Sequence, residues 1–145
     1  MALTDEPFRD DLEARIKTAY PNLATYLSEV PEDDALDWNN GLFSPYVVLY
    51  FGGPIRAAGD HSLVSTRYDT TIVYCTMEIY APLARTARTI KNNLVNLLVG
   101  YYPTDCGELT LEGGLAFTKA SNIVRPTQYI ESVGLSARSN LSWVS

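Results

Sequence analysis

The sequence has few of the residues from which disulfide frameworks, metal sites and catalytic relays are built. Among its 145 residues are two cysteines and one histidine. Neither Cys75 nor Cys106 has a second cysteine or a histidine at metal-ligand spacing, and two cysteines cannot form a disulfide framework. We therefore expect buried free thiols rather than a redox pair, with no bound metal and no cofactor.

Long apolar runs are also missing. The longest candidates, residues 46–51 and 94–99, fall well short of the roughly 18 residues that a membrane helix needs. Residues 1–15 are acidic and have neither the basic start nor the apolar stretch of a secretory signal. The sequence therefore predicts no membrane partner, and a protein that stays in the compartment where it is made.

Basic residues are scarce in the first part of the chain. Segment 1–37 holds ten of the 17 acidic residues and three of the 11 basic ones, and the net charge of the whole chain is −6. This balance argues against nucleic-acid binding through a generally basic surface. A solvated acidic face explains the asymmetry, although a head-to-tail assembly of identical subunits could also use it.

A chain of this length can form one hydrophobic core without disulfides or metals, so we expect a single domain over residues 1–145. Apolar residues at helical spacing predict a first helix from about Pro7 to Tyr20. The segment 23–30 that follows is ambiguous and allows a short strand.

The aromatic and β-branched run 46–51 predicts a strand, because Pro45 precedes it and Gly52-Gly53-Pro54 follows it. The residues before this run, 38–44, are expected to form a loop. Residues 54–68 show little periodicity and are expected to form a long connection over the surface.

Residues 70–80 alternate between two kinds of side chain, which is typical of a strand with one buried face. One side carries Val73, Cys75, Met77 and Ile79, and the other carries Tyr74, Thr76, Glu78 and Tyr80.

A second helix is predicted from Pro82 to near Gly100. Leu109, Leu111 and the pair Gly113-Gly114 then predict a strand with a bend, followed by Leu115 to Phe117. A last strand runs through 129–143 and allows a break near Gly134. The order of these elements predicts an α+β fold, with a mostly antiparallel mixed sheet and two helices packed on one face.

Catalytic patterns are missing from the sequence. Asp60, His61 and Ser62 are consecutive, so one backbone stretch would have to turn all three side chains inward to form a relay. The acidic turn at 33–37 could offer oxygen ligands to Mg²⁺ or Ca²⁺, but its spacing does not match an EF-hand loop. We therefore expect a protein that is not an enzyme and has no catalytic residues.

Two groups of residues are candidates for contacts with partners. Five of the ten tyrosines gather on or beside the predicted hairpin, where they could form an interface core or pack across strands within one subunit. These are Tyr46, Tyr50, Tyr68, Tyr74 and Tyr80. The second helix carries Arg85, Arg88 and Lys91 without acids, which indicates either a hydrated outer face or a basic face presented to a partner or a lumen.

Several segments together resemble one known family. They are an amphipathic first helix, the strand Pro45-Tyr46-Val47-Val48-Leu49-Tyr50, the loop Gly59-Asp60-His61-Ser62-Leu63, the approach Arg67-Tyr68-Asp69, the strand Ile72-Val73-Tyr74-Cys75-Thr76 and the helical start Ala84-Arg85-Thr86-Ala87-Arg88. This layout resembles the tail terminator proteins of long-tailed bacteriophages (siphoviruses), also called minor tail protein U or tail completion proteins.

The resemblance implies a structural virion protein that forms a hexameric ring at the head-proximal end of the phage tail. Such a ring caps the tail tube protein, ends tube growth and offers a surface for head-tail joining to a connector or stopper protein. DNA passes through its lumen only in transit. The protein would be made in the host cytoplasm and would reside in the virion.

On this basis we expect two sets of contact residues. The candidates for subunit or tube contacts are Arg56, His61, Arg67, Tyr68, Tyr74 and Tyr80. The candidates for a basic helix face toward a neighbour or the lumen are Arg85, Arg88 and Lys91.

Two alternatives stay open. The chain could be another head-tail connector or stopper component of the same assembly. It could instead be a small non-enzymatic binding module that holds a ligand between the sheet and the helices, with Tyr74, Glu78 and Tyr80 as polar contacts.

Overall fold

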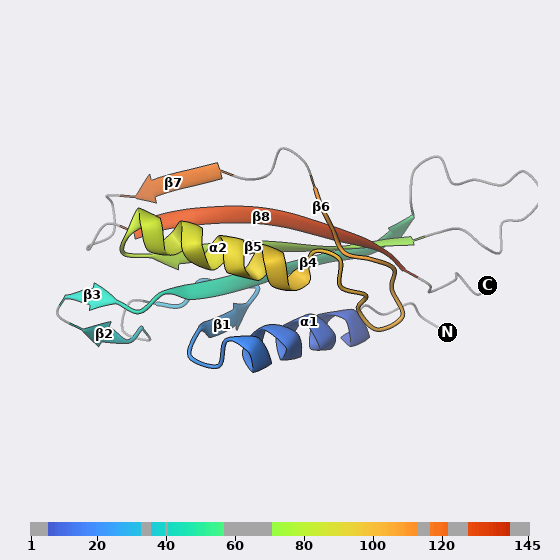
Figure 1. The fold of residues 1–145 in the computed structure, drawn as a ribbon, viewed down its shortest axis with the longest axis horizontal. Helices are drawn as coiled ribbons and strands as arrows, with labels where there is room; N and C mark the ends of the chain where they lie inside the picture. Colours follow the sequence, from blue (N-terminus) through green and yellow to red (C-terminus); the bar gives the residue numbers. More distant parts are fainter. Residues whose placement is uncertain are drawn as a thin grey trace, which may run out of the picture.

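The structure of the chain is a computed structural model that describes residues 6–32, 36–39, 41–56, 71–112, 117–121 and 128–139. The described residues form two helices and a mixed, mostly antiparallel sheet (Figure 1). The α+β class expected from the sequence is therefore confirmed.

Three long strands form the centre of the sheet. β5 (Thr71–Ala81) lies between β4 (Tyr46–Arg56) and β8 (Gln128–Ser139), and it pairs antiparallel with both. Every residue of β5 has a partner on β8, so this register fixes the orientation of the side chains along the sheet.

Short strands complete the structure at its edges. The predicted short strand is β1 (Ala24–Leu27), which pairs parallel with β4. β6 (Thr110–Leu111) and β7 (Phe117–Ser121) pair antiparallel with different parts of β8. β2 (Trp38–Asn39) and β3 (Leu42–Phe43) form a separate small ladder.

The first helix, α1 (Glu6–Ala19), begins and ends one residue earlier than expected. Its buried residues Phe8, Leu12 and Ile16 are four positions apart and so share one face of the helix. Glu6 lies in the first turn, where the helix dipole favours a carboxylate.

The second helix, α2 (Ala84–Leu98), buries Ala87, Leu94 and Leu98 along one stripe. It ends before Gly100, which has a φ of +88° that few other residues adopt. The Gly100 N–H donates to the Leu109 carbonyl at 3.0 Å, which directs the chain back toward β6.

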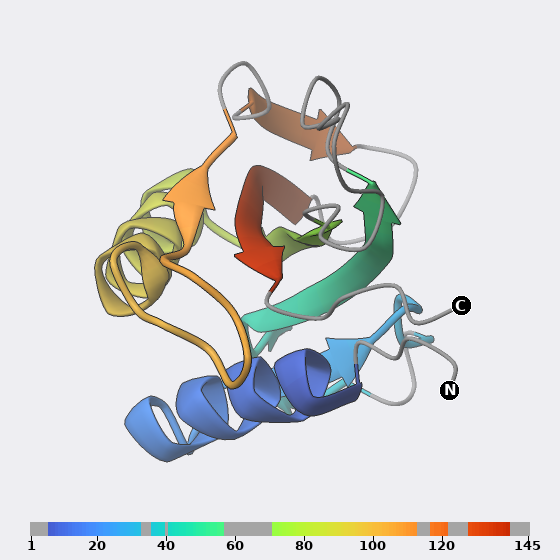
Figure 2. The same ribbon diagram turned by 90° about the vertical axis from the view of Figure 1, so that its right-hand side faces the viewer.

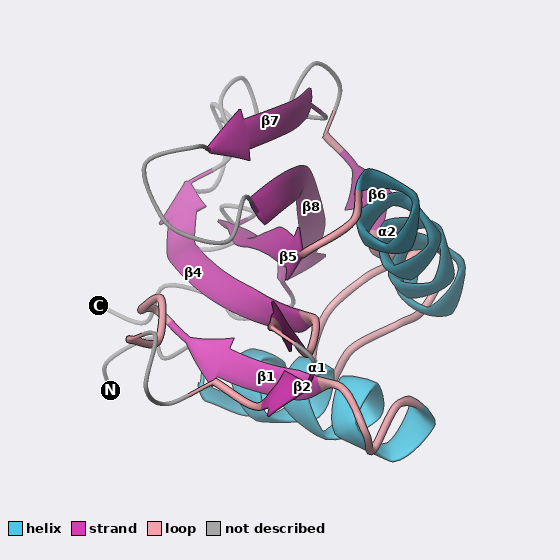
Figure 3. Ribbon diagram, turned by 90° about the vertical axis from the view of Figure 1, so that its left-hand side faces the viewer, coloured by secondary structure: helices cyan, strands magenta, loops and turns pink. Residues whose placement is uncertain are grey.

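Both helices cover the same face of the sheet, as predicted. The residues that form this core share alternate positions on the strands and the apolar stripes of the helices. From the strands they are Val47, Leu49, Val73, Cys75, Met77, Ile79, Val133, Leu135 and Ala137, and from the helices Phe8, Leu12, Ile16, Ala87, Leu94 and Leu98. Figures 2 and 3 show the sheet curving from β4 through β5 and β8 to β7, with both helices on its outer side.

Residues 38–44, expected to form a loop, contain the β2–β3 ladder instead. Trp38 pairs with Phe43, and their rings meet edge to face at 5.8 Å. This cross-strand aromatic pair stabilises a ladder that is too short to be recognised by periodicity. Phe43 also packs on Tyr46, so the ladder joins a second, smaller core on the face of the sheet opposite the helices.

Two strand boundaries also differ from the prediction. β4 continues through the glycines to Arg56 because a register shift between Gly52 and Ile55 accommodates Pro54, which has no N–H to donate. Of the expected connection 54–68, only residues 54–56 are described, and they belong to β4. β8 runs without a break past Gly134, which pairs with Thr76.

We expect Leu94→Ala to lower the free energy of unfolding by about 2–5 kcal/mol, because it leaves a cavity between α2 and the sheet. Leu94 has no exposed surface. Leu111→Ala is the matched control, since Leu111 is largely exposed, and it should change stability by less than about 0.5 kcal/mol. Urea unfolding of both variants measures this, and equal effects would contradict the packing described.

Candidate interaction surfaces

The face of the sheet opposite the helices carries a cluster of aromatic rings. Tyr46 and Tyr80 are paired across β4 and β5, and their rings stack at 4.9 Å with 7° between the planes. Tyr26 of β1 meets the Tyr46 ring edge to face at 5.6 Å. Tyr80 is only 5% exposed, so it belongs to the core of the subunit and not to a contact surface, which corrects one of the interface predictions.

Beside this cluster, Glu78 forms a partly open carboxylate site. The Tyr80 hydroxyl donates to Glu78 Oε2 at 3.0 Å. Tyr50 lies diagonally across from Glu78, since Val48 is the direct partner of Glu78 on β4. Burial and the nearby Glu78 charge raise the pKa of Tyr50, and burial together with the Glu78 hydrogen bond raises the pKa of Tyr80 well above its usual range.

Tyr74 lies on the same face as Glu78, because both alternate with buried residues of β5. Tyr50, Tyr74 and Glu78 are all half-buried. We call these three residues the tyrosine face. A carboxylate beside aromatic rings is suited to bind a cation, through both an ion pair and the faces of the rings.

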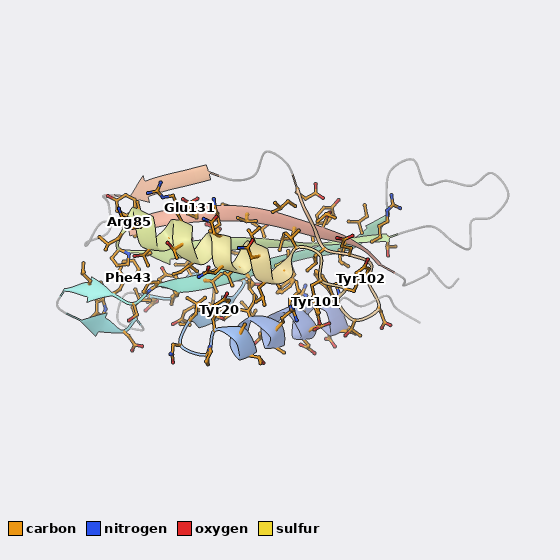
Figure 4. All side chains as sticks on the ribbon, in the orientation of Figure 1. Tyr20, Phe43, Arg85, Tyr101, Tyr102 and Glu131 are labelled. Atoms are coloured by element: carbon orange, nitrogen blue, oxygen red, sulfur yellow. The ribbon has the colours of Figure 1, made fainter. Side chains whose placement is uncertain are left out.

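The outer side of α2 carries two of the predicted cations, Arg85 and Arg88, which are exposed and three residues apart. We call this pair the arginine ridge. The helix contains no Asp or Glu. Among the described residues, no acid pairs with either arginine. Figure 4 places Arg85 at the start of α2.

Lys91 differs from the prediction, because it pairs with a buried acid of its own subunit. Its Nζ lies 3.9 Å from Oε2 of Glu131, whose side chain is 2% exposed. Lys91 is four residues after Ala87 and three before Leu94, so helical spacing places it on the buried stripe of α2. Glu131 alternates with Val133 on β8 and therefore faces the helices (Figure 4). The helical spacing of Lys91 and the alternation of Glu131 with Val133 can both be read from the sequence.

The remaining predicted contacts lie at or beyond the limits of the structure. Arg56 is the last residue of β4, where its backbone pairs with Thr71. His61, Arg67 and Tyr68 lie outside the described residues.

A polar cluster that the sequence pattern does not indicate joins α1 to the segment after α2. Asp11 accepts hydrogen bonds from the Tyr101 hydroxyl at 2.6 Å and from the Thr104 N–H at 2.7 Å. The Arg15 guanidinium lies 3.9 Å from the centre of the Tyr101 ring. Partial burial raises the pKa of Asp11, but the hydrogen bonds from Tyr101 and Thr104 outweigh it and hold this pKa below 3.8. Because these contacts join distant segments, no local pattern indicates them.

A pocket of about 480 Å³ opens between the end of α1, the start of β4 and the middle of α2. Its walls include Tyr20, Leu23, Pro45, Ile90 and Asn93. The residues proposed for a ligand-binding module do not line it. Their side chains lie on the face of the sheet away from the helices, so that set of ligand contacts is corrected.

Comparison with known protein families and with curated protein sequences gives no match. Within the described residues, no cluster of histidine, cysteine and carboxylate side chains could hold a metal ion. Both cysteines are buried and unpaired as thiols, and burial raises the pKa of Cys75 to about 12. None of the described helices is both long and apolar enough to span a membrane.

We expect Asp11→Ala to lower the stability of the protein by about 1–2 kcal/mol at neutral pH, through loss of charge-assisted hydrogen bonds at a partly exposed site. Since the folded pKa of Asp11 is depressed, this contribution is present above its unfolded value of 3.8 and is lost as pH falls through the folded pKa. The difference between wild type and variant should therefore shrink below about pH 4. Unfolding curves at several pH values measure it. Asp10→Ala, at an exposed position, is the control.

Lys91→Met should destabilise the subunit by about 1–3 kcal/mol, because it leaves the buried Glu131 carboxylate without this cation. Arg88→Met should change stability by less than about 0.5 kcal/mol, because Arg88 is exposed. In a double-mutant cycle, Glu131→Gln should reduce the cost of Lys91→Met. Additive effects in urea unfolding would show that Lys91 and Glu131 are not coupled.

Proposed function

We propose that this chain is a structural virion protein of the tail terminator type, which forms a ring on the head-proximal end of a phage tail tube. The proposal rests on the resemblance of its helix and strand segments to that family. The α+β fold, with both helices on one face of a mostly antiparallel sheet, is compatible with it. In the proposed ring the tube protein contacts one side and the connector or stopper protein the other, and DNA only passes through the lumen.

The observation that best supports this function is the position of two groups of exposed large apolar side chains; among the described residues, Leu27 and Val30 are also exposed and belong to neither group. One group lies on β2, β3 and the start of α2, and the other lies after the end of α2 and on β6. The first group consists of Trp38, Leu42 and Leu83, and the second of Val99, Tyr102 and Leu111. The two groups lie toward opposite ends of the long axis of the molecule (Figures 1 and 4).

Exposed apolar groups of this kind favour protein partners. A terminator needs two different partner surfaces at opposite ends of each subunit, one for the tube and one for the connector. Tyr102, which is 65% exposed, and Leu83, which is 54% exposed, are the most exposed large apolar residues in the two groups. We assign each group to one of these partners.

A second candidate function, a small ligand-binding module, is favoured by the pocket beside Tyr20. Its size falls within the range of small-molecule sites. A binding module of this kind acts as a monomer, whereas a terminator assembles on the tube.

The proposed function predicts rings, either in solution or on tubes assembled from the tail tube protein of the same phage. Light scattering and negative-stain images of the protein, alone and mixed with tubes, measure this. Leu83→Asp and Tyr102→Asp should each abolish binding to one partner only, the tube or the connector. The Leu83→Asp change puts a carboxylate at the N-cap of α2, where it favours the helix, so a loss of binding would not reflect unfolding.

A protein that stays monomeric and binds neither the tubes nor the connector would contradict the terminator function. In that case, a saturable rise in melting temperature with a neutral aromatic amide such as benzamide would favour the ligand-binding module.

A further inference from the structure

One carboxylate oxygen of Glu78 accepts no hydrogen bond from the residues that the structure describes. Only its Oε2 is engaged by the Tyr80 hydroxyl, and Oε1 has no partner in the part of the chain that the structure describes. No described lysine or arginine forms an ion pair with it. A half-buried carboxylate has lost part of its hydration, so a cation that reaches it is bound more strongly than at an open surface. Tyr50 lies next to this site, diagonally across the β4–β5 pair, and Tyr74 lies further along the same face of β5.

The arginine ridge carries the opposite charge and, like Glu78, has no ion-pair partner among the described residues. Arg85 and Arg88 project from one side of α2, and the described residues offer them no acid. Lys91, the third cation of the helix, is already paired with Glu131. The two arginines are therefore the cations of α2 that remain available to a partner. A guanidinium can bind a carboxylate with two hydrogen bonds and stack on an aromatic ring at the same time.

These two sites face in opposite directions. The register of β5 places Glu78 on the face of the sheet away from the helices, because its neighbours Met77 and Ile79 pack under them. α2 covers the other face of the sheet (Figure 2). Helical spacing from the buried stripe places Arg85 on the side of α2 turned away from the sheet and Arg88 on its exposed flank. One subunit thus carries a cation donor on one face and a cation acceptor on the opposite face. Contacts between unlike patches on opposite faces join identical subunits head to tail, and such contacts can close into a ring.

We propose that Arg88, supported by Arg85, of one copy binds Glu78 on the tyrosine face of the next copy in the ring. This inference rests on the proposed function, since it names the contact between neighbouring subunits. It leaves the two apolar groups to the tube and the connector. Both partners of the contact come from this chain, so a second copy is the occupant of the tyrosine face.

A charge exchange tests this contact. Glu78→Arg places two cations opposite each other, and Arg88→Glu places two acids opposite each other. Each variant alone should need an about 10- to 100-fold higher concentration to form rings than the wild type. An equimolar mixture should recover assembly, because the arginine introduced in one variant meets the glutamate introduced in the other, while the reverse contact keeps the native pair. Alternating copies close without a mismatched contact in a ring with an even number of subunits, such as a hexamer.

Controls separate assembly from folding. Asp10→Arg makes the same charge change at an exposed position of α1, on the face of the sheet opposite the tyrosine face, and should assemble as the wild type. Glu78→Gln keeps the shape of the side chain, and it should weaken assembly less than Glu78→Arg. Circular dichroism establishes that each variant is folded, and Arg88→Glu alters only an exposed side chain.

The outcomes distinguish the contact from the function. Rings of the wild type with unaffected single variants, or a mixture that fails to assemble, would overturn the proposed contact and leave the terminator function standing. A wild type that forms no ring, alone or on tail tubes, would overturn both. Failure of the single variants with recovery in the mixture supports the contact.

Discussion

The pairing of β5 with both of its neighbours is the constraint on which the other features depend. β5 is hydrogen-bonded to β4 on one side and to β8 on the other, and both pairings are antiparallel. Because side chains alternate along a strand, a slip of one residue would exchange Met77 for Glu78 beneath the helices. The buried methionine and the open carboxylate site therefore have the same cause. The hydrophobic core under α1 and α2 selects the register, and the register in turn sets the composition of the tyrosine face.

The elements with local periodicity could be predicted from the sequence, and those that depend on distant partners could not. The alternation of β5 and the apolar stripes of both helices are repeated within each segment, so their faces were correctly assigned. The parallel pairing of β1 with β4 and the bulge after Gly52 depend on segments that meet only in the fold. Tyr80 shows the same limit: alternation identified its face, but its burial comes from Tyr46 and Phe43.

Lys91 shows a different kind of error. Its charge groups it with Arg85 and Arg88, although its spacing from Ala87 and Leu94 places it on the buried stripe of α2. The acid that it meets, Glu131, occupies a position on β8 where alternation would favour an apolar residue. Two charges that each break an apolar pattern at positions facing each other indicate an ion pair. Such a pair contributes less to stability than to the choice of one arrangement, because a rotated α2 would leave Glu131 buried without this cation.

The orientation of α2 also determines which of its cations are available at the surface of the subunit. The buried stripe of α2, formed by Ala87, Leu94 and Leu98, sets the rotation of the helix about its axis, and the Lys91–Glu131 pair agrees with it. Arg85 and Arg88 are therefore left exposed. In the proposed ring, the contact between the exposed arginine ridge and the half-buried Glu78 would guide subunits into register and would weaken as the salt concentration rises. The apolar groups toward the two ends act differently, since burial of their surface is not screened and stabilises a permanent joint. In the proposed assembly, the charge contact would therefore set the register between neighbouring subunits, and the apolar groups would hold the ring against its partners at the two ends.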